Sequence, residues 1–289
     1  MFVSGHGACT PTFILSAYFC FSLGLDAGTT TRLLGLSEST VNRIFSVALE
    51  VVATDVQSRE ATVEFGKLPG GFTADVEADE KSFKKWQSPG DDGMKFYWYP
   101  YVLVTQRGSQ SKTVMRPMGV TSSTNRARAP PLKVETWTEI VNELFCEGAR
   151  INLMTDGAVA YALVDHPAIS SKFRVIHEQK EYVRSADILS NPDLPVADGQ
   201  FRSGKLGCQK AEGAWHHISK YVPDSLHAPM TDKAMHILDL HIRRGQWMYI
   251  LSTDDPWPRF SAAASNYSRG VLATSGNKVT TNLARTSFA

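Results

Sequence analysis

The chain has 289 residues, 43% of them apolar, and a formal net charge of +1 at pH 7. This length and composition suffice for one large hydrophobic core or two smaller ones. The net charge neither indicates nor excludes a nucleic-acid partner, because such surfaces depend on local clustering of charge. The four cysteines contain no CxxC pair, so the sequence shows neither a zinc ribbon nor a disulfide framework.

The most apolar stretch of the chain covers residues 13–25. It is shorter than the roughly 20 residues that a membrane-spanning helix needs. No basic segment precedes it, as one would in a signal peptide. We therefore expect a buried helix there, no membrane association and an intracellular protein.

Residues 26–56 allow two interpretations. A short helix over 29–34, a turn at Gly35 and a second helix capped by Ser37 would form a helix-turn-helix. The outward positions of the second helix, where a recognition helix meets bases or phosphates, would be Ser39, Thr40, Asn42 and Arg43. The other interpretation is an ordinary helical hairpin packed on the core, and the pattern alone does not decide between the two.

A mixed α/β unit is predicted over residues 63–185. Aromatic and β-branched runs predict its strands, and apolar residues at helical spacing predict its helices. The predicted strands are 72–83, 96–106, 113–120, 150–155 and 173–177, and the predicted helices are 134–145 and 158–164. Three hairpin-like strands followed by alternating helix and strand is the order of the ribonuclease H-like fold. That fold places an Asp of its first strand beside an Asp at the end of its fourth.

The remainder of the chain is predicted to contain two further helices. Residues 187–206 are rich in Pro and Gly and predict a loop. Helices are predicted over 211–221 and 235–250. Residues 256–289 are rich in Ala, Ser, Thr and Asn without an evident period, and predict a flexible tail.

Two predicted strands carry acids. In the first strand, alternation puts Glu77 and Asp79 on one face and Glu80 on the other, so we expect neither Glu77 nor Glu80 to be a primary ligand. Carboxylates crowded on one face repel each other unless cations or water compensate. Asp156 ends the fourth strand, where open α/β sheets bind ligands. Taken singly, Asp79 is better explained as a solvated strand-end acid and Asp156 as part of an ordinary Asp-Gly turn.

A third acid, Glu212, lies at the start of the helix predicted over 211–221. Two strand-borne Asp residues and one helix-borne Glu can hold two divalent cations for phosphoryl transfer. The alternative is an acid that is favoured at this position only by the helix dipole.

Three motifs resemble those of the DDE transposases of the ISXO2-like (Merlin) group. They are Val76-Glu-Ala-Asp79-Glu80, Thr155-Asp156-Gly157 with Tyr161, and Glu212 with Trp215. Those transposases have an acid-Asp-Glu strand, a Thr-Asp-Gly followed by a Tyr, and an acid three residues before a Trp. The resemblance covers residues 10–250. One departure is that the family has a lysine seven residues after the third acid, where this chain has Ser219 followed by Lys220.

The resemblance implies a function and a set of partners. Asp79, Asp156 and Glu212 would hold two Mg²⁺ or Mn²⁺ ions and catalyse strand cleavage and transfer at transposon ends. The partners would be transposon-end and target DNA, with a homo-oligomer allowed. Lys220 would contact a phosphate in place of the family's lysine. The location would be with DNA, in the nucleus of a eukaryote or the cytoplasm or nucleoid of a bacterium.

The resemblance also favours the helix-turn-helix interpretation, because these transposases carry a small DNA-binding region ahead of the catalytic domain. The predicted organisation is a helical DNA-binding region over 1–62, a ribonuclease H-like catalytic domain over 63–255 and the tail over 256–289. Two alternatives remain: a domesticated, catalytically inactive transposase-derived DNA-binding protein, or a ribonuclease H-like nuclease without transfer activity.

Overall fold

The computed structural model describes most of the chain between residues 10 and 270. The described residues are 10–68, 72–90, 93–124, 129–175, 184–189, 201–223, 226, 231–251 and 254–270. They form two compact units, one combining the chain up to Arg59 with the chain from Asp239 on, and the other comprising Glu60–Leu238. Among the described helices, none combines the length and the apolar character that crossing a membrane requires.

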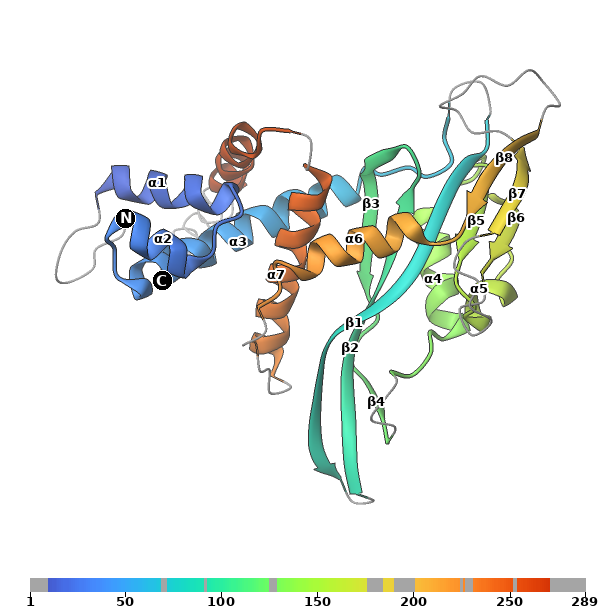
Figure 1. The fold of residues 1–289 in the computed structure, drawn as a ribbon, viewed down its shortest axis with the longest axis horizontal. Helices are drawn as coiled ribbons and strands as arrows, with labels where there is room; N and C mark the ends of the chain where they lie inside the picture. The colour runs from blue at the N-terminus through green and yellow to red at the C-terminus, as the bar shows by residue number, and fades with distance from the viewer. Residues whose placement is uncertain are drawn as a thin grey trace, which may run out of the picture. The chain divides into compact units, whose positions relative to one another are not determined.

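The first unit consists of helices (Figure 1). They are α1 (Pro11–Ser22), α2 (Ala27–Leu34), α3 (Glu38–Glu60), the part of α7 (Asp232–Ile250) that begins at Asp239, and a helix over 256–270. Local polar side chains start two of them. The Thr10 hydroxyl accepts the Phe13 N–H at 3.4 Å in α1, and the Asp26 carboxylate accepts the Thr29 N–H at 2.8 Å in α2. Gly35, with φ 64°, ends α2 in the left-handed conformation that glycine tolerates best.

The core of this unit joins residues that are far apart in the sequence. Phe21 of α1 packs edge-to-face on Phe45 of α3, with ring centroids 5.1 Å apart. Trp247 of α7 belongs to the same buried cluster, and its indole N–H donates to Asp55 of α3 at 3.1 Å. Arg259 donates to the same carboxylate at 3.1 Å. Asp55 of α3 therefore holds both α7 and the helix over 256–270, whose contacting residues follow it by 192 and 204 positions.

The helix over 256–270 corrects the prediction of a flexible tail. Trp257, Phe260 and Tyr267 occur three and seven residues apart, so the segment has an apolar helical face, which its many Ala and Ser residues conceal. Phe260 is 1% exposed and belongs to the core of the first unit. The prediction is therefore wrong for these residues, and residues 271–289 lie outside the described residues.

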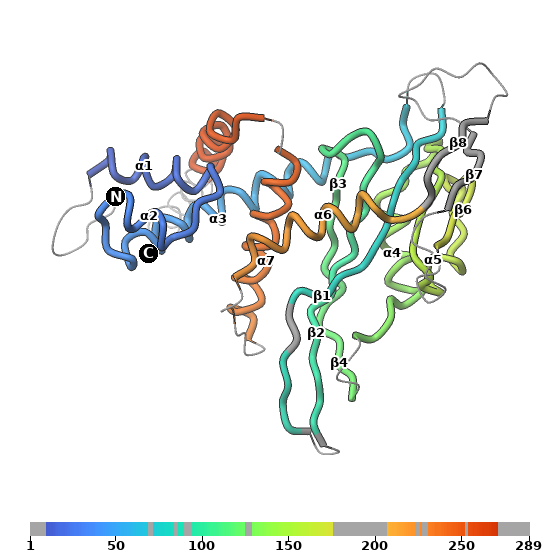
Figure 2. Tube along the Cα trace, viewed as in Figure 1, coloured from blue at the N-terminus to red at the C-terminus, as the bar shows by residue number. Residues whose placement is uncertain are grey.

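The second unit is built on a mixed six-stranded sheet with the order β3-β2-β1-β5-β6, in which β4 also pairs with β2 (Figure 1). The strands are β1 (Ala74–Gly90), β2 (Gly93–Gln106), β3 (Ser109–Pro117), β4 (Thr121–Ser123), β5 (Ile151–Thr155) and β6 (Ile169–Arg174). β1 to β4 pair antiparallel, whereas β5 and β6 run parallel to β1. This arrangement confirms the predicted mixed α/β class and is consistent with a ribonuclease H-like fold. β1 and β2 continue past the sheet as a long two-stranded ribbon (Figure 2).

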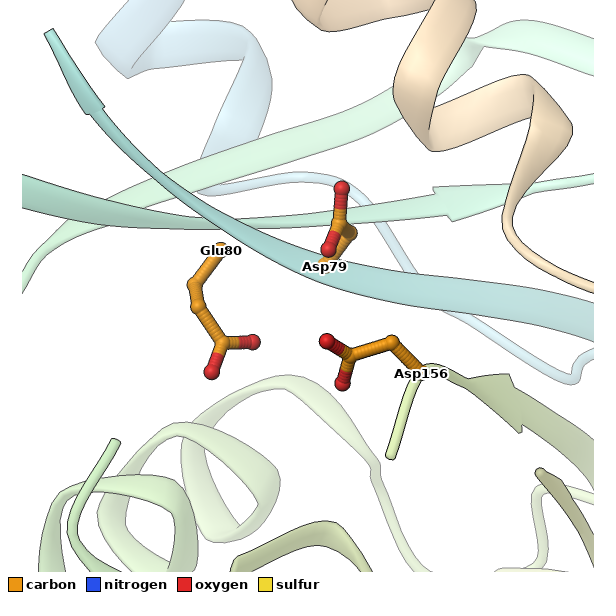
Figure 3. Close-up of side chains that lie close together, drawn as sticks. All are labelled: Asp79, Glu80 and Asp156. Atoms are coloured by element: carbon orange, nitrogen blue, oxygen red, sulfur yellow. The ribbon is translucent and has the colours of Figure 1, made fainter. Parts of the chain in front are cut away.

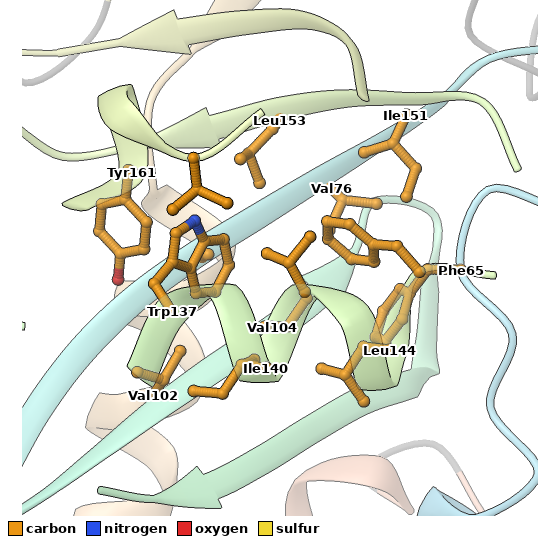
Figure 4. Close-up of a cluster of buried hydrophobic side chains, with 14 of the residues drawn as sticks. Phe65, Val76, Val102, Val104, Trp137, Ile140, Leu144, Ile151, Leu153 and Tyr161 are labelled. Carbon is orange, nitrogen blue, oxygen red and sulfur yellow. The ribbon is translucent and has the colours of Figure 1, made fainter. Parts of the chain in front are cut away.

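Helices cover both faces of this sheet. They are α4 (Val134–Leu144), α5 (Val159–Leu163) and α6 (Gln209–Ser219). On one face, Val76 of β1 belongs to the same apolar cluster as Trp137 of α4 and Tyr161 of α5, whose rings meet edge-to-face at 4.8 Å (Figure 4). On the other face, Phe83 of β1 meets Trp215 of α6 at 5.4 Å. Alternation along β1 thus gives the strand one face for α4 and α5 and the other for α6.

A separate two-stranded sheet pairs β7 (Arg184–Leu189) with β8 (Phe201–Leu206). The loop predicted over 187–206 is therefore wrong for these strands. β8 reads Phe-Arg-Ser-Gly-Lys-Leu, which lacks the β-branched run on which strand prediction relies. The strand predicted over 173–177 begins earlier, as β6, and residues 176 and 177 lie outside the described residues.

Candidate functional site

Asp79 and Asp156 lie at the same level of two neighbouring parallel strands. Ala78 of β1 pairs with Thr155 of β5, and each acid follows that pair by one residue. Asp156 leaves the strand, and its Oδ1 accepts the Ala158 N–H at 3.0 Å, which holds the carboxylate in a turn. This placement matches the sequence prediction, whereas the catalytic role of the two acids stays a prediction.

Glu80 joins this pair, which corrects the expectation that alternation would remove it from the site. Asp79 and Glu80 do leave β1 on opposite sides (Figure 3). Asp156, however, extends from the end of the neighbouring strand into the space that both side chains reach. One carboxylate oxygen from each of the three lies within 4.8 Å of the others. We call Asp79, Glu80 and Asp156 the carboxylate cluster.

Burial and repulsion between neighbouring charges raise the pKa of two acids in the carboxylate cluster, Asp79 and Glu80. Burial, followed by the charges of Asp156 and Glu80, raises the pKa of Asp79 to about 8. Burial and the charge of Asp156 raise the pKa of Glu80 to about 7, although a hydrogen bond from Tyr161 opposes the rise. Burial and these charges also raise the pKa of the Tyr161 phenol well above its usual value. Tyr161 therefore stays protonated and donates to the Glu80 carboxylate.

The carboxylate cluster has the chemistry of a site for a hard divalent cation. Carboxylate oxygens are the ligands that Mg²⁺ and Mn²⁺ prefer in proteins. A bound cation would offset the repulsion that raises the pKa values of Asp79 and Glu80. The residues present therefore fit the metal that the sequence predicts.

Glu212 acts on this site electrostatically but is not a member of the carboxylate cluster. It lies in the first turn of α6 and is exposed. Its negative charge contributes to raising the pKa of Asp79 and that of the Cys208 thiol. Cys208 Sγ donates to the Ala78 carbonyl oxygen at 3.6 Å, so the start of α6 is tied to β1 next to Asp79.

A lysine of β1 contacts the last residue of α6. Ser219 occupies the position at which the resembling family has a lysine, and its hydroxyl accepts a hydrogen bond from Lys81 Nζ at 2.8 Å. Lys81 follows Asp79 by two residues, on the same face of β1. Burial lowers the pKa of Lys81, and the charge of Asp79 opposes this. Lys220 is the exposed residue immediately after α6, and its predicted phosphate contact stays a prediction.

The residues predicted to bind DNA lie in the first turns of α3. Ser39, Asn42 and Arg43 are exposed, and Thr40 is half-buried. The Ser37 hydroxyl accepts the Thr40 N–H at 3.2 Å, as the predicted cap requires. α3 is 23 residues long in total. The exposure of these residues agrees with either of the two interpretations, so the helix-turn-helix stays a prediction.

Two contacts near the site escaped the sequence analysis. The first is the hydrogen bond between Tyr161 and Glu80. The sequence feature that could have indicated it is the tyrosine on the short apolar helix α5, because a buried tyrosine hydroxyl usually has a hydrogen-bond partner. The second is between Glu77 and Arg107, whose Nε donates at 2.6 Å. Arg107 lies in the turn after β2, and no pattern in the sequence marks it.

Comparison with known proteins gives little further identification. No family model matches the chain, and no curated protein matches it. Among solved structures, the chain is similar to the Drosophila P element transposase in its strand transfer complex, at 13% identity and a TM-score of 0.30. The match covers 86% of this chain and 60% of that one. No match supports the ISXO2-like group in particular. Because the TM-score is 0.30, this similarity does not identify a function.

Proposed function

We propose that this protein is a DDE-type DNA transposase of the ISXO2-like kind, which cleaves DNA strands and transfers them in a reaction that requires a divalent metal. The carboxylate cluster is the observation that supports this most. Two acids from neighbouring parallel strands and a third beside them meet where β5 ends next to β1, the middle strand of the mixed sheet. Acids with pKa values raised as far as those of Asp79 and Glu80 are typical of a functional site.

The proposed roles follow from the position of each acid. Asp79 and Asp156 are the ligands that the two strands hold in place, and Glu80 is a further ligand that Tyr161 orients. Glu212, the third acid of the predicted set, supplies a further carboxylate from α6, since two divalent ions need more negative charge than Asp79 and Asp156 alone offer. When bound, two Mg²⁺ or Mn²⁺ ions would activate a water or a DNA 3′-hydroxyl and stabilise the leaving oxygen.

DNA binding is part of the same proposal. The exposed side chains at the start of α3 would contact DNA as a recognition helix does, and Lys220 would contact a phosphate near the metal site. The catalytic domain would comprise the mixed sheet with α4, α5 and α6. Location with DNA and assembly into a homo-oligomer belong to the proposal as well.

The test is nicking of supercoiled DNA in the presence of Mn²⁺ or Mg²⁺, together with calorimetric titration of each metal. Glu212→Gln keeps the size of the side chain and removes its charge. We expect this variant to fold and to bind DNA, and to lose metal-dependent nicking by at least about 100-fold. Glu80→Gln should weaken metal binding, because its carboxylate lies in the cluster. Glu139→Gln, which alters an exposed acid of α4, is the matched control and should behave as wild type.

The outcomes separate the alternatives. Nicking without joining of a 3′ end to target DNA would indicate a ribonuclease H-like nuclease. Metal and DNA binding without nicking would indicate an inactive, transposase-derived DNA-binding protein. A wild-type protein that binds neither Mn²⁺ nor Mg²⁺ would refute the metal site itself.

A further inference from the structure

Glu77 is a fully buried carboxylate, 0% exposed, on the same face of β1 as Asp79. Its Oε1 accepts a hydrogen bond from Arg107 Nε at 2.6 Å. Its Oε2 accepts the backbone N–H groups of Lys210 at 2.7 Å and Ala211 at 3.0 Å. Burial raises the pKa of Glu77, and these three donors oppose the rise. The buried charge is thus compensated by a cation and by the start of a helix.

The two amide groups are the ones that a helix usually satisfies with its own cap. Cys208 is the N-cap residue of α6, and its side chain makes no capping hydrogen bond. Lys210 and Ala211 are the second and third residues of the helix, whose N–H groups an N-cap side chain ordinarily accepts. Glu77 therefore caps α6 from a different element, β1. Its negative charge also suits the positive end of the helix dipole.

Arg107 holds the segment that leads into the same helix. Its Nη2 donates to the Gly207 carbonyl oxygen at 2.9 Å, and its backbone N–H donates to the Asp75 carbonyl oxygen of β1 at 2.9 Å. Gly207 has φ 135°, a conformation open to glycine, and this permits the turn into α6. The Glu77–Arg107 pair thus fastens the residues on both sides of the N-cap to β1.

Glu212 follows Ala211 directly and lies in the same first turn. We propose that the Glu77–Arg107 pair is a positioning unit, which sets Glu212 toward Asp79 without itself touching metal or DNA. This inference rests on the proposed function, since it concerns the third acid of that site. β1 then carries both Asp79 and Glu80 of the carboxylate cluster and Glu77, the anchor of the helix that supplies Glu212.

The test compares Glu77→Gln with a second buried carboxylate, Glu60→Gln. Gln keeps the size of the side chain, but its amide NH₂ group presents donors where the carboxylate accepted. Glu60 is 6% exposed, accepts the Met115 N–H at 2.8 Å and pairs with Arg116, both residues of β3. Each variant is assayed for Mn²⁺ binding by calorimetry and for DNA nicking at saturating Mn²⁺. We expect Glu77→Gln to lose about 10- to 100-fold in affinity or rate, and Glu60→Gln to lose stability alone.

Coupling to Glu212 separates positioning from general weakening. In a Glu212→Gln background, Glu77→Gln should cause no further loss, because the residue that it positions has already lost its function. Additive losses, or a Glu77→Gln variant with wild-type affinity and rate, overturn the inference. Arg107→Lys keeps the charge but not the fork that reaches both Glu77 and Gly207, so it gives the same readouts if Glu77→Gln does not fold.

Failure of the proposed function has a different signature. If the wild type binds no Mn²⁺ and Glu212→Gln is indistinguishable from it, the proposed function and this inference fall together. If Glu212→Gln impairs nicking and Glu77→Gln does not, the inference alone falls.

Discussion

Replacement of Asp79 by Asn should make the metal-free protein more stable at alkaline pH. The ordinary pKa of this carboxyl group is 3.8, and in the folded protein it rises to about 8 because of burial and the neighbouring charges. Between these two values the folded state binds more protons than the unfolded state. The free energy of unfolding therefore falls as pH rises from about 4 to about 8. Asn cannot ionise, so Asp79→Asn removes this loss.

The magnitude follows from the difference in pKa. One pKa unit corresponds to about 1.4 kcal/mol, which sets a ceiling of about 6 kcal/mol on the cost of ionising Asp79. Glu80 and Asp156 remain in the variant, and the protons of such neighbouring acids are linked, so part of the cost persists. We expect Asp79→Asn to gain about 2 to 4 kcal/mol over wild type at pH 8.5, and to differ little from it at pH 4, close to the ordinary pKa.

The assay is urea unfolding in the presence of a chelator at both pH values, with unfolding detected as amide hydrogen exchange in peptides from β5. This readout reports on the second unit alone, which matters because a chain with two compact units need not unfold in one transition. Addition of Mn²⁺ should stabilise wild type and not Asp79→Asn. Glu139→Gln serves as the control without a pH-dependent difference. If Asp79→Asn follows wild type at both pH values, Asp79 ionises freely and the reasoning about a crowded cluster is refuted.

Three further outcomes are expected. Glu60→Gln should lower the free energy of unfolding by about 2 to 3 kcal/mol, because the Glu60 side chain is 5% exposed and paired with Arg116. Glu143→Gln should lower it by less than about 1 kcal/mol in the same urea titration, because Glu143 is 53% exposed. Gly66→Ala should lower the free energy of unfolding by about 2 to 4 kcal/mol, because φ is 72° and the new Cβ would lie 2.7 Å from Cγ1 of Ile151. Gly148→Ala should lower it by about 1 to 2 kcal/mol, because φ is 78° but the new Cβ would meet no atom within 4 Å. Arg43→Ala should weaken DNA binding and reduce the slope of its salt dependence by about one, as measured by fluorescence anisotropy; an unchanged slope would leave α3 without a role in phosphate contact.

The sequence predicted the features that depend on local pattern. Acidic and apolar residues alternate in the strand that bears Asp79, and the strand that ends before Asp156 is mostly apolar. The parallel pairing of these two strands follows from the order of the elements. The placement of Glu80 could not be predicted in this way. Alternation describes one strand, whereas the approach of Glu80 to Asp156 depends on where the neighbouring strand ends.

The contacts that hold α6 are the other part that the sequence did not predict. The cap of this helix comes from Glu77, which precedes it by more than 130 residues, whereas capping rules consider only the residues next to a helix end. The helix over 256–270 was missed for a compositional reason. Its aromatic residues are separated by Ala and Ser, a composition that also occurs in disordered tails.

The discontinuity of the first unit has a consequence for biosynthesis. Phe21 and Phe45 of its core are translated early, but Trp247 and Phe260, which complete that core, follow the whole of Glu60–Leu238. The second unit is continuous in sequence and can fold as it leaves the ribosome, since domains generally fold as units during synthesis. The N-terminal helices must meanwhile expose apolar surface. In a growing chain they are therefore the segment most in need of a chaperone until the last helices emerge.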